Sequence, residues 1–187
     1  LRMVVLRAPP GMSTLQALDA LQAADPGGIY DFDHVYDPSD GQTNASDLGS
    51  ATSAANGAGA RIGMIDAGVA LDHPALRGAR IQSRSFTGET NAATSAHGTA
   101  VASLLVGDDG AFHGAAPGAQ LYAADVFGES IEGGSVEAIA NALAWMASEH
   151  VMVVNISLTG PRNRVLDSVC QAMIARGLIL VAAAGND

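Results

Sequence analysis

Residues 61–66 read RIGMID, a short apolar run that ends in an acidic residue and is followed directly by Ala67-Gly68. A run of this length and composition is typical of a strand buried inside a sheet. In a parallel sheet, ligands and catalytic groups collect at the carboxyl ends of the strands. Asp66 stands at that position, so it is the first candidate for a functional residue.

Outward from this run, apolar segments alternate with stretches of helical periodicity. We predict further strands at residues 79–86, 120–126, 151–157 and 178–184, and helices at residues 97–106, 136–146 and 165–176. The continuous apolar run at 151–157 predicts a strand that is covered on both faces. Repeated strand–helix–strand units indicate an α/β fold, a three-layer domain with a mainly parallel sheet.

The beginning of the chain has a different pattern, which predicts a small separate α+β unit. Residues 2–6 are apolar and β-branched, and Ser13 with Gln16 has the form of a capping box that opens a helix. Residues 29–36 alternate aromatic or histidine side chains with aspartates, as in a half-buried strand. The predicted parts are the unit 1–36, a flexible linker 37–59 rich in Gly, Ser, Ala, Asn and Asp, and the α/β part 60–187.

The composition excludes several classes of protein. With 48% hydrophobic residues among 187, the chain can bury a core, and no apolar run reaches the roughly 18 residues of a membrane-spanning helix. The net charge of −10 argues against nucleic acid or an anionic membrane surface as a partner. Lysine is absent, which excludes Schiff-base chemistry and a lysine-dependent phosphate loop. A single cysteine, Cys170, cannot form an internal disulfide.

Two further polar residues stand beside apolar elements. His97 opens the predicted helix, and Asn186 follows the apolar run 181–185. A carboxylate beside a histidine accepts the Nδ1 proton, which orients the ring so that Nε2 can deprotonate a hydroxyl. An asparagine amide at a neighbouring strand end can donate to a developing oxyanion. Each residue taken singly is more often a turn, capping or surface residue, so the combination with Asp66 is what favours catalysis.

Several segments resemble the subtilisin-like serine proteases, the subtilases. These are RIGMIDAGV at 61–69, DHPAL at 72–76, HGTAVA at 97–102, GAAPGA at 114–119, VNISL at 154–158 and AAAGN at 182–186. The resemblance implies a subtilisin-like fold, of which residues 60–187 would form the N-terminal part, and a serine endopeptidase that works through an acyl-enzyme. Residues 2–36 are similar to the second half of a subtilase inhibitory propeptide.

The resemblance also implies a role for individual residues. Asp66 would be the triad carboxylate, His97 the general base and Asn186 the oxyanion-hole donor. The expected substrate-binding residues are Ser157, Leu158, Thr159 and Gly160 on one wall, Ala183, Ala184 and Gly185 on the other, and Gly133 with Gly134 on the opposite rim. An extended substrate would pair with these edges as an added strand. Thr159 stands where many relatives have glycine, which could narrow the pocket.

The third member of the family triad, a serine in a Gly-Thr-Ser motif, does not occur up to Asp187. We therefore expect a fragment that is inactive alone and that needs a missing C-terminal half carrying this serine. The propeptide-like segment would cover the cleft as in a zymogen, and the linker would contain the maturation cut. The alternative is a non-catalytic subtilase-like module that binds a peptide or a partner protein.

Other sites are not expected. The absence of G-x-G-x-x-G after the first strand disfavours a nucleotide-binding domain. No cofactor and no metal are predicted, and the loop 106–113 is too short to resemble that of calcium-binding relatives. Family likeness implies a secreted or periplasmic protein, although the sequence shows no signal peptide.

Overall fold

The computed structural model describes residues 3–39, 56–88, 93–128 and 133–183. Its larger sheet has five strands in the order β3-β4-β2-β6-β8, and every neighbouring pair is parallel. The strands are Arg61–Asp66 (β2), Arg80–Ser85 (β3), Gln120–Asp125 (β4), Val153–Ile156 (β6) and Ile179–Ala182 (β8). All five were predicted, and the limits of all but β2 were predicted slightly too wide. Because β2 is the central strand, Asp66 lies at the middle of the carboxyl edge of the sheet.

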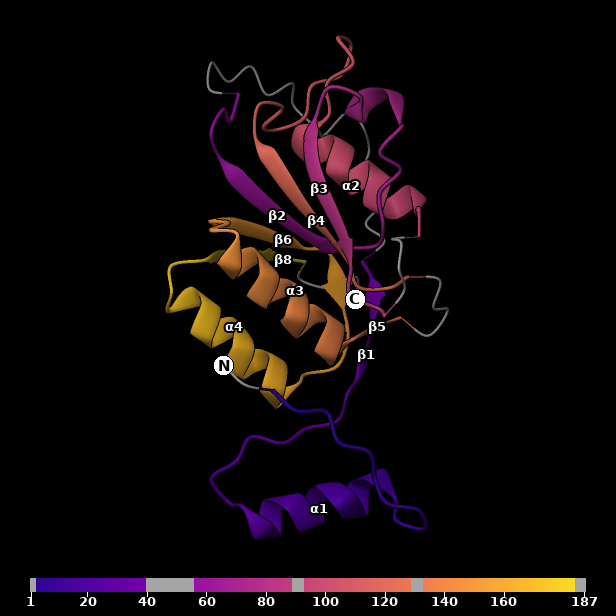
Figure 1. The fold of residues 1–187 in the computed structure, drawn as a ribbon, viewed down its shortest axis with the longest axis vertical. Helices are drawn as coiled ribbons and strands as arrows, with labels where there is room; N and C mark the ends of the chain where they lie inside the picture. The colour runs from indigo at the N-terminus through magenta and orange to yellow at the C-terminus, as the bar shows by residue number, and fades with distance from the viewer. Residues whose placement is uncertain (1–2, 40–55, 89–92, 129–132, 184–187) are drawn as a thin grey trace.

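Helices cover the sheet on two sides, which confirms the three-layer α/β fold (Figure 1). They are Ala96–Val106 (α2), Val136–Ser148 (α3) and Arg164–Ile174 (α4), with a short 3-10 helix at Pro74–Leu76 (η1). Successive residues of β2 point to opposite faces: Met64 packs in one core with Val106 of α2, and Ile65 packs in another with Leu143 of α3. Burial of each such side chain contributes about 1.5–3 kcal/mol.

Helices α3 and α4 begin where the sequence provides a capping residue. The Ser135 hydroxyl accepts a hydrogen bond from the N–H of Ala138 at 3.1 Å and so opens α3. The Asn163 side chain accepts from the N–H groups of Val165 and Leu166 at 3.0 and 2.9 Å and so opens α4. Such caps satisfy donors that have no partner inside the helix.

One face of the sheet is less covered than the sequence predicts. Val153 of β6 is 36% exposed, and Ile179 and Val181 of β8 are 57% and 51% exposed. The expectation that residues 151–157 are covered on both faces is therefore wrong for the described part of the chain. A continuous apolar run shows that a strand can be buried, but the neighbouring elements decide whether it is.

The N-terminal unit forms its helix but not the strand predicted at residues 2–6. Helix α1 spans Thr14–Ala24, and its capping box between Ser13 and Gln16 is present. Figure 1 shows α1 apart from the sheet, and none of its residues is buried. Residues 3–6 are extended without strand partners, and Val4 and Leu6 are more than 60% exposed. β-Branched composition favours an extended chain, but a strand also needs a neighbour to pair with.

The second strand of this unit is shorter than predicted and lies further along the chain. The sequence places it at 29–36, whereas the observed strand β1 spans Val35–Pro38 and enters the predicted linker. Strand β1 pairs antiparallel with Gly134–Ser135 (β5) on one side and Leu158–Thr159 (β7) on the other. The alternating pattern at 29–36 indicates which side chains can pack against the rest of the protein, but it does not show where the backbone pairs. Strand hydrogen bonds form only where β5 and β7 offer backbone groups.

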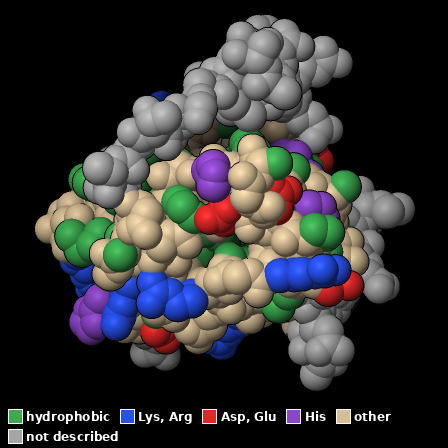
Figure 2. All heavy atoms as spheres, turned by 90° about the horizontal axis from the view of Figure 1, so that it is seen from above, with side chains coloured by type: hydrophobic (Ala, Val, Ile, Leu, Met, Phe, Trp, Pro, Cys, Tyr) green, Lys and Arg blue, Asp and Glu red, His purple; other side chains and the backbone are tan. Residues whose placement is uncertain are grey.

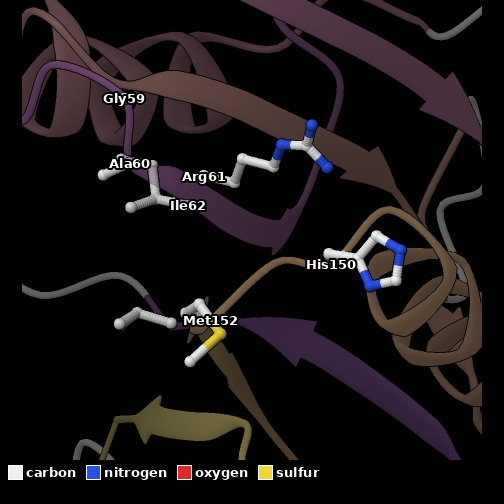
Figure 3. Close-up of a pocket in the computed structure, with 7 residues that line it drawn as sticks. Gly59, Ala60, Arg61, Ile62, His150 and Met152 are labelled. Atoms are coloured by element: carbon white, nitrogen blue, oxygen red, sulfur yellow. The ribbon is translucent and has the colours of Figure 1, made fainter.

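A cavity of about 310 Å³ lies at the amino ends of β2 and β6 (Figure 3). Its lining comes from residues 59–62 at the start of β2 and from His150, Met152 and Val153 before and in β6. Parallel strands place their amino and carboxyl ends at opposite edges of a sheet, so this cavity is remote from Asp66. It takes no part in the candidate site.

The surface gives no sign of a large basic region on the face drawn in Figure 2. Arginine side chains lie there in separate groups, interspersed with acidic and apolar ones. The expectation that nucleic acid is not a partner stays a prediction. Among the described helices, none is both long and apolar enough to cross a membrane.

Candidate active site

Asp66 ends the central strand and is completely buried. Its Oδ1 atom accepts a hydrogen bond from the N–H of Ala67 at 2.6 Å and contacts Nδ1 of His97 at 2.7 Å. Burial raises the pKa of Asp66 above its ordinary value, while the hydrogen bonds from Ala67 and His97 lower it and offset part of the effect. The geometry holds a carboxylate where it can fix the tautomer and the orientation of the imidazole.

His97 stands in the first turn of α2, and its side chain is 23% exposed. With Nδ1 turned to Asp66, its Nε2 atom is 3.2 Å from the carbonyl oxygen of Ser39, directly after strand β1. Strand β1 lies between β5 and β7, and the space between these two strands that residues 35–39 occupy is called the groove below. The pair joins residues 31 positions apart in the sequence. The structure therefore brings Asp66 and His97 together as the sequence predicted.

Gly98 makes this approach possible. A Cβ atom at Gly98 would overlap the carbonyl oxygen of Ala67, so any larger residue would push α2 away from the end of β2. Thr99 holds the same junction, because its hydroxyl accepts from the N–H of Ala70 at 2.9 Å and donates to the carbonyl of Ser95 at 2.6 Å. The start of the helix is thus fixed against the loop that follows Asp66.

Most of the predicted substrate-binding residues that the structure describes lie on either side of the chain's own residues 35–39. Gly134 pairs with Tyr36, and Leu158 and Thr159 pair with Pro38 and Asp37. The expected walls described here are Ser157, Leu158, Thr159 and Gly160 on one side and Gly133 with Gly134 on the other. The groove is therefore bounded by two edges that offer backbone hydrogen bonds to an extended chain.

Part of the predicted site cannot be compared with the structure. Ala183 is described, and its N–H donates to the carbonyl of Ile156 at 3.3 Å, which continues the β6–β8 ladder beyond β8. Ala184, Gly185 and Asn186 lie outside the described residues. Their assigned roles, the second pocket wall and the oxyanion-hole donor, remain predictions.

Other residues at the groove were not found by sequence reasoning. Asp125 ends β4 beside Asp66 and is buried; its Oδ1 accepts from the N–H groups of Phe127 and Gly128 at 3.0 and 2.9 Å. It fixes the backbone that leaves the strand toward the Gly133 rim. The same strand-end rule that selected Asp66 could have found it. Tyr36 and Ser39 lack such a signal, because their position depends on strand pairing across the sequence.

A comparison with protein families identifies the chain. The model of the subtilase family of peptidases matches residues 57–187, which include Asp66, His97 and the groove walls. The chain belongs to the subtilase family. Among curated relatives, this subtilase is 33% identical over 136 residues to subtilisin E of Bacillus subtilis (strain 168) and 35% identical over 135 residues to subtilisin DY of Bacillus licheniformis.

The match covers 70% of this subtilase but only 35% of subtilisin E and 48% of subtilisin DY. The chain thus spans between a third and a half of the length of these relatives. A cold-adapted subtilisin-like serine proteinase has a similar structure, with a TM-score of 0.63, 27% identity and coverage of 72% of this chain and 50% of that one. The self-cleaved protease domain of PatA gives a TM-score of 0.57 at 27% identity, covering 68% and 49%.

Metal ligands do not gather in the part of the subtilase that the structure describes. No group of three or more His, Cys, Asp or Glu side chains is placed there to hold an ion. A second His–Asp pair, His113 with Asp108 at 3.1 Å, is on the surface, with both side chains 52% exposed. It differs from the Asp66–His97 pair in burial, because the side chains of that pair are only 0% and 23% exposed.

Proposed function

We propose that this subtilase chain supplies the carboxylate and the general base of a serine endopeptidase of the subtilisin type. The observation that carries the proposal is the 2.7 Å contact between buried Asp66 and His97 beside a groove that holds an extended chain. A buried carboxylate, a partly exposed imidazole and an edge for strand pairing are the parts that peptide hydrolysis needs.

In this mechanism, Asp66 keeps the Nδ1 proton on His97 and stabilises the imidazolium that forms. Nε2 takes the proton of a serine hydroxyl, and that oxygen attacks the substrate carbonyl. The proton then passes to the leaving amine, and water releases the acyl group by the same route. The serine would come from residues beyond 187, and Asn186 would donate to the oxyanion. The chain alone would then be inactive.

The N-terminal residues would act as an inhibitory propeptide. Their contacts with the start of two helices support this role: Asp31 Oδ2 accepts from the N–H of Arg164 at 2.7 Å, and Asp33 Oδ1 accepts from the N–H of Glu137 at 3.2 Å. Carboxylates are stabilised at helix N-termini, where N–H groups lack partners inside the helix. The segment 35–39 then blocks the groove until it is removed. Export from the cytoplasm is part of the same proposal.

The test uses the full-length gene product, compared with the 187-residue chain. We expect the full-length protein to hydrolyse casein and to react with a fluorophosphonate probe for serine hydrolases, and the 187-residue chain to do neither. Labelling of the shorter chain would contradict the assignment of the nucleophile. A full-length protein that binds peptides but neither hydrolyses them nor reacts with the probe would favour the non-catalytic module instead.

A further inference from the structure

Only one of the two carboxylate oxygens of Asp66 is hydrogen-bonded within the part of the chain that the structure describes. Oδ1 accepts from the N–H of Ala67 and contacts Nδ1 of His97, whereas Oδ2 is buried and accepts from none of the described residues. A buried acceptor without a donor costs free energy, and the cost is larger for a charged group. An ionised Asp66 therefore needs a donor directed at Oδ2.

The two strands beside β2 offer Asp66 different neighbours (Figure 1). On β4 its register partner is Asp125, a second buried carboxyl group, and an ionised carboxylate accepts hydrogen bonds but cannot donate one. On β6 the ladder ends with Ile65 opposite Ile156, and the N–H of the next residue, Ser157, donates to the carbonyl of Ile65 at 3.3 Å. Of the two residues that flank Asp66, Ser157 is therefore the one with a side-chain hydrogen to donate.

The hydroxyl of Ser157 is oriented by Asn155. The Nδ2 atom of Asn155 donates to the Oγ atom of Ser157 at 2.6 Å. A hydroxyl has one hydrogen and two acceptor lone pairs, so Oγ keeps its own hydrogen for another partner. Asn155 is opposite Met64 in the ladder, and alternate residues of a strand share a face. Ser157 thus lies on the same face of the sheet as Asp66, the face that α2 covers.

We propose that Ser157 is a positioning residue of the protease, whose hydroxyl donates to Oδ2 of Asp66 and holds the ionised carboxylate in place for His97. The inference rests on the proposed function and goes further, since it gives the side chain of Ser157 a role separate from that of its backbone. The carbonyl of Ser157 accepts from the N–H of Ser39 at 2.9 Å and belongs to the groove. The hydroxyl serves the Asp66–His97 pair.

The electrostatics of Asp66 support this role. Burial is the largest influence and raises the pKa of Asp66, whereas hydrogen bonding by Ala67, His97 and the Ser157 hydroxyl lowers it. Hydrogen bonds of catalytic groups are often long in the resting protein and tighten as the reaction proceeds. The bond to Oδ2 tightens as His97 takes up the proton, because the ionised carboxylate is the form that stabilises the imidazolium.

The test measures kcat and KM of the full-length protein on a peptide substrate across the acid limb of its pH profile. Ser157→Ala removes the hydroxyl but keeps the carbonyl that pairs in the groove. We expect kcat to fall about tenfold or more while KM stays nearly unchanged. The acid limb of kcat/KM should move to higher pH, because the Asp66–His97 pair takes up a proton more readily without the donor.

Two further variants separate this role from a structural one. Ser157→Thr keeps the hydroxyl and should restore both kcat and the pH profile. Ser103→Ala is the matched control, since Ser103 is also half-buried and its hydroxyl donates to the carbonyl of Thr99 at 2.8 Å, later in α2 than His97. It should leave kcat and the pH profile nearly unchanged.

If Ser157→Ala does not fold, Asn155→Ala decides, because it removes the donor that orients the hydroxyl. It should lower kcat and move the acid limb in the same direction. Unchanged kcat, a rise in KM alone, a fall in kcat without a shift of the acid limb, or an equal loss in Ser157→Thr overturns this inference but not the proposed function. Absence of peptide hydrolysis and of fluorophosphonate labelling in the unmodified full-length protein overturns both.

Discussion

At the scale of single residues, the proposed catalysis and the folding of the chain place opposite requirements on the charge of Asp66. Catalysis of the proposed kind needs the ionised carboxylate, which stabilises a positively charged His97. Folding has to remove that charge from water, because the side chain is completely buried. The N–H of Ala67 and the imidazole offset part of this cost, yet the pKa of Asp66 remains raised. In the proposed mechanism, the residue would therefore serve catalysis at the expense of stability.

This conflict predicts the pH dependence of stability. With a raised native pKa, folded Asp66 retains a proton that the unfolded chain has lost, so its contribution to the free energy of unfolding falls as the pH rises above about 4. Asp66→Asn removes this dependence. The stability of the variant relative to the unmodified chain should increase as the pH rises above about 4, in urea unfolding of the 187-residue chain.

Asp109 offers a control of opposite sign. Hydrogen bonds from the N–H groups of Phe112 and Ala111 lower its pKa, so its contribution is present above the ordinary carboxyl range and is lost as the pH falls. Asp109→Asn should therefore become less stable, relative to the unmodified chain, as the pH rises. A pH-independent difference for Asp66→Asn, or the same sign for both variants, would contradict the assignment.

At the scale of elements, Asn163 joins helix α4 to the N-terminal segment. It is 2% exposed, and its Oδ1 atom caps the helix, while its Nδ2 atom donates to the carbonyl of Phe32 at 2.8 Å and lies 3.0 Å from Nδ1 of His34. One amide thus satisfies a helix end and holds the segment that enters the groove.

Two substitutions at Asn163 separate these functions. Asn163→Ala loses both and should lower the free energy of unfolding by about 2 kcal/mol or more, because a cap and a buried hydrogen bond are removed. Asn163→Asp keeps the acceptor for the helix but places a carboxylate against the Phe32 carbonyl. In hydrogen exchange, it should retain protection in α4 and lose protection at residues 35–39. Unchanged protection of these residues in Asn163→Asp would show that Asn163 does not hold the segment.

The elements also show what the sequence could predict. Helices α1 and α3 follow from capping residues and apolar periodicity, and α4 follows from apolar periodicity, because both signals are local. The five parallel strands follow from apolar runs of the right length. Strand β1 was misplaced because its limits are set by β5 and β7, which lie about 100 or more residues further along the chain. Pairing between distant segments leaves little local signal.

At the scale of the whole molecule, local sequence signals predict one part of the site, and pairing between distant segments sets the other part. Asp66 and His97 were predicted because a parallel sheet brings strand ends and helix starts to one edge, whatever lies between them. Tyr36 and Ser39 were missed because their place in the groove depends on the register of β1. The fold therefore places His97, at the edge of the sheet, against residues 35–39 of the same chain.

The most direct test of the account measures kcat for the full-length protein on a peptide substrate, with His97→Ala and His113→Ala as a matched pair. Both histidines contact an aspartate, but only His97 is beside the groove. We predict that His97→Ala lowers kcat by several orders of magnitude and that His113→Ala leaves it nearly unchanged. A His97→Ala enzyme that retains near-normal kcat would contradict the assignment of the general base.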